Sequence, residues 1–154
     1  AGGCPGARVV FGQNQGGEDA AELGRGPRQA IRSELNQWPV QLHLVRPDAP
    51  YFKGRDLVLM ATCAPVASAD MHWRFIRGRG LAVACPKLDR REGYVEKLAA
   101  ILSEPTIPRA IVVRMEVPCC GGLLELVRQA AALSKRSDLQ VEEMVVALNG
   151  DILS

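Results

Sequence analysis

Three near-continuous apolar runs, each followed closely by cysteine and proline, constrain the fold more than any other feature of this chain. Runs of this kind are typical of parallel β-strands that are covered on both faces. Each run therefore predicts a buried strand that leads into a thiol. The runs cover residues 57–62, 81–84 and 110–117, and the cysteines that follow them are Cys63, Cys85 and the adjacent pair Cys119 and Cys120.

Helix-like segments alternate with these runs. Residues 66–76 read as a short helix or a loop and helix, 91–102 as an amphipathic helix, 122–134 as a helix, and 144–148 as a last strand. This alternation predicts an α/β fold, a mostly parallel Rossmann-like sheet of about four to five strands with helices on both faces.

The chain before the first apolar run is less regular. Residues 1–27 read as a Gly-rich N-terminal arm that carries Cys4, and residues 28–154 as a single α/β cysteine-rich domain. Within these parts the patterns predict a short strand at 9–11, a helix over 27–35 and a strand over 40–45. Ala1-Gly2-Gly3 is more typical of a cut end than of a natural start, so we expect a preceding segment.

Composition excludes several classes of function. The 154 residues carry 19 Lys and Arg against 17 Asp and Glu, a net charge of +2 that argues against nucleic acid or an anionic membrane as partner. No apolar run is long enough to span a bilayer, and no signal-peptide pattern opens the chain. The chain has five cysteines, which cannot all pair with one another, and it is long enough to fold without disulfide bonds. We expect reduced thiols and a cytoplasmic location.

The thiols predict a common site, because the carboxyl ends of parallel strands meet at one edge of a sheet and ligands bind there. Soft thiolates suit zinc, copper(I) and iron–sulfur clusters. We therefore expect a metal or redox site, with Cys4 brought to it by the N-terminal arm and His72 as a further ligand or a surface histidine. The predicted ligands are Cys4, Cys63, Cys85, Cys119, Cys120 and His72.

The pair Cys119 and Cys120 leaves a second interpretation open. Gly121 and Gly122 allow close backbone approach, and the N-terminus of the helix that follows lowers thiolate pKa values. One thiol of the pair could thus act as a nucleophile or carry a persulfide in a thiol-based redox or sulfur-transfer enzyme. The structural alternative is that these cysteines serve only as small hydrophobic side chains in the core. No phosphate-binding loop, dinucleotide motif or Ser-His-Asp set is present to assign a catalytic residue.

Four segments resemble the C-terminal domain of ferredoxin-like iron–sulfur proteins of anaerobic prokaryotes. The resemblance covers nearly the whole chain, and that family carries cysteines at all five matching positions and a histidine at His72. The segments are Cys4-Pro5-Gly6, Gln37-Trp38-Pro39-Val40-Gln41-Leu42, Cys85-Pro86-Lys87-Leu88-Asp89 and Glu116-Val117-Pro118-Cys119-Cys120-Gly121.

The resemblance implies electron transfer. In that family a ferredoxin domain precedes this one, but no C-x₂-C-x₂-C run occurs here. We therefore expect an iron–sulfur cluster, with [4Fe–4S] favoured, and a redox partner protein or a fused ferredoxin domain as partner. The alternative is zinc, in a zinc-binding interaction domain that docks a redox partner. A homodimer is a further possibility. The residues do not decide between an electron carrier and an enzyme.

Overall fold

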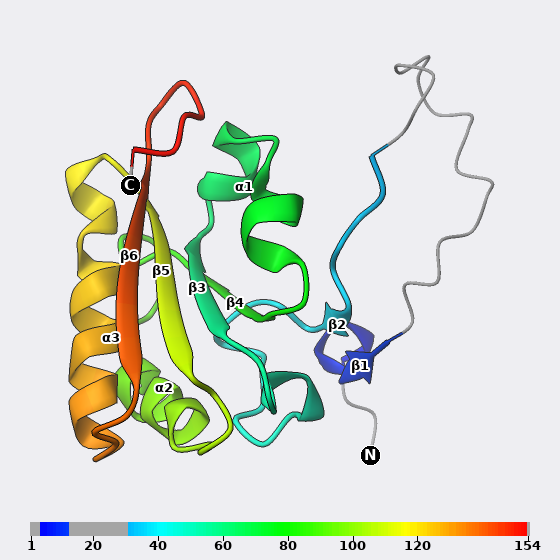
Figure 1. Cartoon of the computed structure of the whole chain (residues 1–154), viewed down its shortest axis with the longest axis vertical. Coiled ribbons are helices and arrows are strands. Elements are labelled where there is room, and N and C mark those ends of the chain that lie inside the picture. Colours follow the sequence, from blue (N-terminus) through cyan, green and yellow to red (C-terminus); the bar gives the residue numbers. More distant parts are fainter. Residues whose placement is uncertain (1–3, 13–30, 154) are drawn as a thin grey trace.

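A four-stranded parallel sheet forms the centre of the computed structural model, which describes residues 4–12 and 31–153 (Figure 1). The strands lie in the order β4-β3-β5-β6, and every neighbouring pair is parallel. All residues of β3 and β4 are buried, as their apolar runs predict. The α/β fold class is thus confirmed. The strands are β3 (Leu57–Ala61), β4 (Gly80–Ala84), β5 (Arg109–Met115) and β6 (Gln140–Val146).

Helices cover both faces of this sheet. Figure 1 shows α2 and α3 on one side of the strands and α1 with the π-helical turn η3 on the other. No helix in the described part of the chain is both long and apolar enough to cross a membrane. The helices are α1 (Ala64–Ala67), η3 (His72–Ile76), α2 (Tyr94–Leu102) and α3 (Gly122–Leu133), and short 3₁₀ turns are η1 (Pro5–Ala7), η2 (Pro50–Phe52) and η4 (Pro118–Cys120).

The strand order places a topological switch point between β3 and β5. From β3 the chain moves to β4 on one side, whereas the connections from β4 to β5 and from β5 to β6 run the other way. The loops after β3 and β5 therefore leave toward opposite faces of the sheet, with α1 on one side and α3 on the other. Such a topological switch point is where open α/β sheets bind their ligands.

The segment before the sheet corrects one prediction. Leu42 N donates to Val83 O at 2.9 Å and Val83 N to Val40 O at 2.7 Å, which covers the outer edge of β4. The predicted strand over 40–45 is nevertheless wrong, because the chain turns after Leu42 and Val45 N donates to Gln41 O at 3.0 Å. Leu42 and Val45 are both buried while Leu44 is exposed, a spacing that belongs to a turn.

A small two-stranded sheet holds the N-terminal segment. β1 (Val10–Phe11) pairs antiparallel with β2 (Gln37–Trp38), in agreement with the predicted strand at 9–11. The predicted helix over 27–35 is absent from residues 31–35, and residues 13–30 lie outside the described part of the chain. Within this segment Glu34 N donates to His72 Nδ1 at 3.1 Å, so a tertiary contact takes the place of a helical one.

Two element ends differ from the pattern for identifiable reasons. α2 begins at Tyr94 because Gly93 has φ +79°, a left-handed conformation that interrupts the helix. β6 begins at Gln140, earlier than predicted, because its polar side chains find partners on β5. Arg109 donates to Glu142 at 3.1 Å and Arg114 pairs with Glu143. The charged residues of β6 are thus paired within the sheet, and a hydropathy pattern alone does not show that they belong to a strand.

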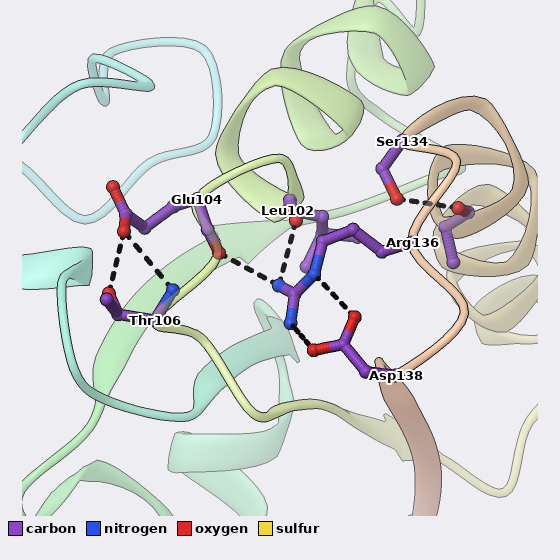
Figure 2. Close-up of polar contacts among 7 residues, drawn as sticks. Leu102, Glu104, Thr106, Ser134, Arg136 and Asp138 are labelled. Atoms are coloured by element: carbon purple, nitrogen blue, oxygen red, sulfur yellow. Dashed lines mark hydrogen bonds and ion pairs between the residues drawn. The ribbon is translucent and has the colours of Figure 1, made fainter.

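Arg136 joins two connections at the amino edge of the sheet (Figure 2). Its guanidinium donates to Leu102 O at 3.1 Å and to Glu104 O at 2.8 Å, just beyond the C-terminus of α2. It also donates to the Asp138 carboxylate at 3.1 and 2.7 Å. A cation at this position satisfies carbonyls that a helix end leaves without partners.

Replacing Arg136 by Met should lower the free energy of unfolding by about 2 kcal/mol, because two buried carbonyls lose a charged donor. Urea unfolding followed by circular dichroism measures this change. Asp138→Asn is the matched control. The Arg136 side chain is 10% exposed and that of Asp138 is 69% exposed, so the control should lose less stability. Equal losses in both variants would show that only the surface ion pair matters.

Candidate thiol site

The four cysteines of the folded body follow the carboxyl ends of three neighbouring strands. Cys63 comes after β3 and precedes α1, Cys85 comes directly after β4, and Cys119 and Cys120 lie in η4 between β5 and α3. The parallel registers of β3 with β4 and with β5 bring these ends to one edge, as the sequence predicts. All five cysteines of the chain are free thiols.

Cys120 lies near two of the other thiols, Cys119 and Cys63, and we call these three cysteines the three-thiol group. Cys120 is 6% exposed, whereas Cys63 and Cys119 are exposed. Burial raises the pKa of the Cys120 thiol, a backbone hydrogen bond at Met115 lowers it, and the neighbouring Cys119 and Cys63 thiols raise it further. The group lies at the switch point between β3 and β5.

The turn that carries Cys85 packs against the same end of α3. A Cβ atom built on Gly122 would lie 3.4 Å from Pro86 Cβ, so this glycine allows the Pro86 ring to approach the first turn of the helix. Cys119 and Cys120 lie just before that turn, separated from it by Gly121. The contact between Gly122 and Pro86 thus places the Cys85 turn beside the three-thiol group.

Asp89 closes the Cys85 turn. Its carboxylate Oδ2 accepts from Cys85 N at 2.8 Å and from Tyr94 Oη at 2.5 Å, and its own N donates to Cys85 O at 2.9 Å. Burial raises the pKa of the Tyr94 hydroxyl, and the hydrogen bond to Asp89 and the negative charges of Asp89 and Cys85 raise it further. Tyr94 is therefore neutral and acts as a donor.

The structure does not bring Cys4 to this edge. Gly6 O accepts from Trp38 Nε1 at 2.7 Å, and the neighbouring Gln37 side chain binds both backbone groups of Leu81. Leu81 precedes Cys85 along β4 by about 13 Å of extended strand. Figure 1 accordingly draws η1 and β1 beside β2, well below α1. Cys4 is exposed on this N-terminal segment.

His72 is occupied by a structural contact. Its Nδ1 accepts from Glu34 N at 3.1 Å, which ties η3 to the segment before β2. The two acidic side chains near the cysteine turns are occupied as well, since Glu116 Oε1 accepts from Leu148 N at 2.9 Å and Asp89 holds the Cys85 turn. Among residues 4–12 and 31–153, no three His, Cys, Asp or Glu side chains are arranged to hold a metal ion.

The sequence does not reveal that Asp89 and Tyr94 hold the Cys85 turn. Tyr94 belongs to the apolar stripe of the predicted helix over 91–102, and Asp89 is a carboxylate near a cysteine turn that could move protons or be solvated or helix-capping. The signal that could reveal them is the spacing of Asp89 four residues after Cys85, which closes one turn, and of Tyr94 five residues further. Such spacing becomes informative only once the helix start at Tyr94 is known.

Comparisons with known proteins agree with this fold. A family model described as Rossmann-like domain matches residues 49–154. A protein of Archaeoglobus fulgidus, described as an uncharacterized protein, is 32% identical over 119 residues, which cover 77% of this chain and 83% of that protein. No solved structure matches the chain.

Gly122→Val should destabilise the protein by about 1–3 kcal/mol, because the added side chain must displace the Pro86 ring from a packed position. Chemical denaturation measures the loss. Gly121→Ala is the matched control, since a Cβ there would meet only Pro118 O at 3.5 Å, an ordinary contact. A Gly122→Val protein as stable as Gly121→Ala would show that the two cysteine turns are not packed together.

The thiols should also differ in reactivity in metal-free protein. Iodoacetamide should modify Cys63 and Cys119 well before Cys120, because Cys120 is buried and its raised pKa leaves less thiolate at neutral pH. Peptide mass spectrometry at successive times gives the order. Modification of Cys120 first, in protein that retains its folded circular dichroism spectrum, would contradict the buried position.

Proposed function

We propose a function for this chain from one premise: it belongs to the Rossmann-like domain family. In such sheets the ligand site lies beyond the carboxyl ends of the strands, at the switch point. The three-thiol group occupies that position in this chain. We infer that the protein is a redox module whose thiolates hold an iron–sulfur cluster, with [4Fe–4S] favoured, and this clustering of thiols is the observation that carries the proposal.

The spread of the thiols favours a cluster over zinc. A closed zinc site needs four ligands that converge on one ion at about 2.3 Å. The described residues contain no such convergent group, although three thiols are electrostatic neighbours. An iron–sulfur cluster contains several iron atoms, so its thiolates bond different metal atoms and need not meet at one point. Thiols that lie near one another without converging on one point suit the larger group better.

The proposed ligands are Cys63, Cys119 and Cys120, with Cys85 as the fourth. Four thiolates are the usual complement of a cluster. The Pro86–Gly122 contact supports Cys85, because it places that turn against the end of α3 where Cys119 and Cys120 lie. α3 begins without a side-chain cap at Gly121, and the partial positive charge of its N-terminus favours thiolates.

The resemblance to ferredoxin-associated domains supports the same function. A bound cluster would supply one-electron transfer, and this chain would supply the thiolates, the burial of Cys120 and the helix terminus that favours thiolate charge. The partner would be a redox protein or a fused ferredoxin domain in the cytoplasm. The exposed Cys63 and Cys119 lie on the side of the group that such a partner could approach.

A thiol enzyme is the second candidate, favoured by the contrast between the paired cysteines. Cys119 is exposed in η4, just before α3, whereas Cys120 is buried beside it with a raised pKa. Cys119 would then be the nucleophile and Cys120 or Cys63 its resolving thiol. This assignment keeps the same site and the same fold. It replaces metal ligation by nucleophilic chemistry at the exposed Cys119 sulfur.

Anaerobic reconstitution with ferrous iron and sulfide tests the leading proposal. The wild-type protein should gain stoichiometric iron and acid-labile sulfide and a visible absorption band. Substituting Ser for Cys63, Cys119 or Cys120 should lower the iron content at least severalfold while the apo-protein stays folded. Colourless, folded protein without bound iron would overturn the cluster proposal.

Cys4→Ser is the matched control, because the same chemical change falls on a thiol that the structure places away from the three-thiol group. Its iron content should equal that of the wild type. Loss of iron in this variant would instead show that the N-terminal segment closes the site. If wild-type protein binds no iron but Cys119 alone alkylates much faster than the other thiols, the thiol enzyme becomes the better assignment.

A further inference from the structure

We propose that Asp89 is a positioning residue, which fixes Cys85 at the candidate site through its backbone and is itself held by Tyr94. The assignment of Cys85 as a fourth cluster ligand rests on the proposed function. The positioning of Cys85 does not, because it follows from hydrogen bonds within the chain. Asp89 touches no ligand and acts only through the turn that carries the thiol.

Hydrogen bonds to Asp89 hold both backbone polar groups of Cys85. Cys85 N donates to Asp89 Oδ2 at 2.8 Å, and Cys85 O accepts from Asp89 N at 2.9 Å. Both backbone polar groups of Cys85 are thus bound to a single residue four positions later. The side chain is the only part of Cys85 left to interact with a ligand. A closed five-residue turn of this kind presents its first side chain in one direction.

Tyr94 holds the carboxylate that makes this turn. Tyr94 is 2% exposed and begins α2, so the packing of the helix fixes its hydroxyl. That hydroxyl donates to the same Asp89 Oδ2 at 2.5 Å, which is a short, charge-assisted hydrogen bond. The Tyr94 ring also lies beside the His43 ring, with centroids 4.6 Å apart. Asp89 is therefore anchored to the core through Tyr94.

A second contact fixes the turn from the other side. Pro86 packs against Gly122, and Pro86 is buried. The turn is consequently held between α2, through Tyr94 and Asp89, and α3, through Gly122. This double attachment agrees with the half-buried position of Cys85 at the start of the turn that follows β4. Loss of either attachment should release the Cys85 thiol toward solvent.

Alkylation of metal-free protein at one fixed pH tests the positioning. Asp89→Ala should raise the iodoacetamide rate at Cys85 by about tenfold, since a turn that loses two charge-assisted hydrogen bonds opens more often. Asp89→Asn should stay close to the wild-type rate, because its amide oxygen can still accept from Cys85 N and Tyr94 Oη. The rate at Cys119 in the same samples is the internal reference.

The two Asp89 variants separate geometry from charge. Both remove the carboxylate charge, but only Asp89→Ala removes the acceptor. If Asp89→Asn accelerates Cys85 as much as Asp89→Ala does, charge rather than position is responsible and the proposal is overturned. Tyr94→Phe provides a test that does not depend on the folding of Asp89→Ala. It should accelerate Cys85 by a smaller factor, and an unchanged rate would overturn the proposal too.

Reconstitution with iron and sulfide gives the second readout. Asp89→Ala should retain less iron and a shifted visible spectrum, while Asp89→Asn should match the wild type in both. Asp138→Ala, a carboxylate at the opposite edge, is the matched control and should change neither measurement. If wild-type protein binds no iron, the proposed function fails while the alkylation rates still decide the role of Asp89.

Discussion

The candidate site depends on one structural constraint, the parallel pairing of β3 with both β4 and β5. This pairing aligns three strand ends at a single edge, so cysteines that lie far apart in the sequence become neighbours. It also sends the loops after β3 and β5 to opposite faces, which places the three-thiol group at the topological switch point. A shift of either register would move one cysteine turn along the edge and separate the thiols.

Burial then gives the thiols different characters. Cys120 is buried in the core, while Cys63 and Cys119 are exposed. Cys85 is held between two helices by Asp89 and by the Pro86–Gly122 contact. A site built this way combines an inner sulfur, which is protected from solvent, with outer sulfurs that a ligand or partner can reach. Such a combination suits the proposed cluster, which must exchange electrons with a partner while it stays bound to the protein.

The sequence predicts the sheet well because buried parallel strands leave a strong local pattern. The apolar runs that lead to Cys63, Cys85 and Cys119 are typical of parallel strands that are covered on both faces. The sequence fails at 40–45, where an alternating pattern arises from a turn, and at 140–143, where charged residues of β6 are paired with arginines of β5. It also fails to place Cys4, because the position of an N-terminal segment depends on tertiary contacts such as Trp38 with Gly6 rather than on local pattern.

The two edges of the sheet differ in how their polar groups are used, and this difference locates the chemistry. At the amino edge Asp56 pairs with Arg79 and Arg109, and Arg136 pairs with Asp138 and two carbonyls, so the charges there serve stability. At the carboxyl edge the carboxylates of Asp89 and Glu116 are equally committed to backbone groups. The same edge carries Cys63, Cys85, Cys119 and Cys120. This concentration of thiols is what supports the proposal of soft ligation or thiol redox chemistry there.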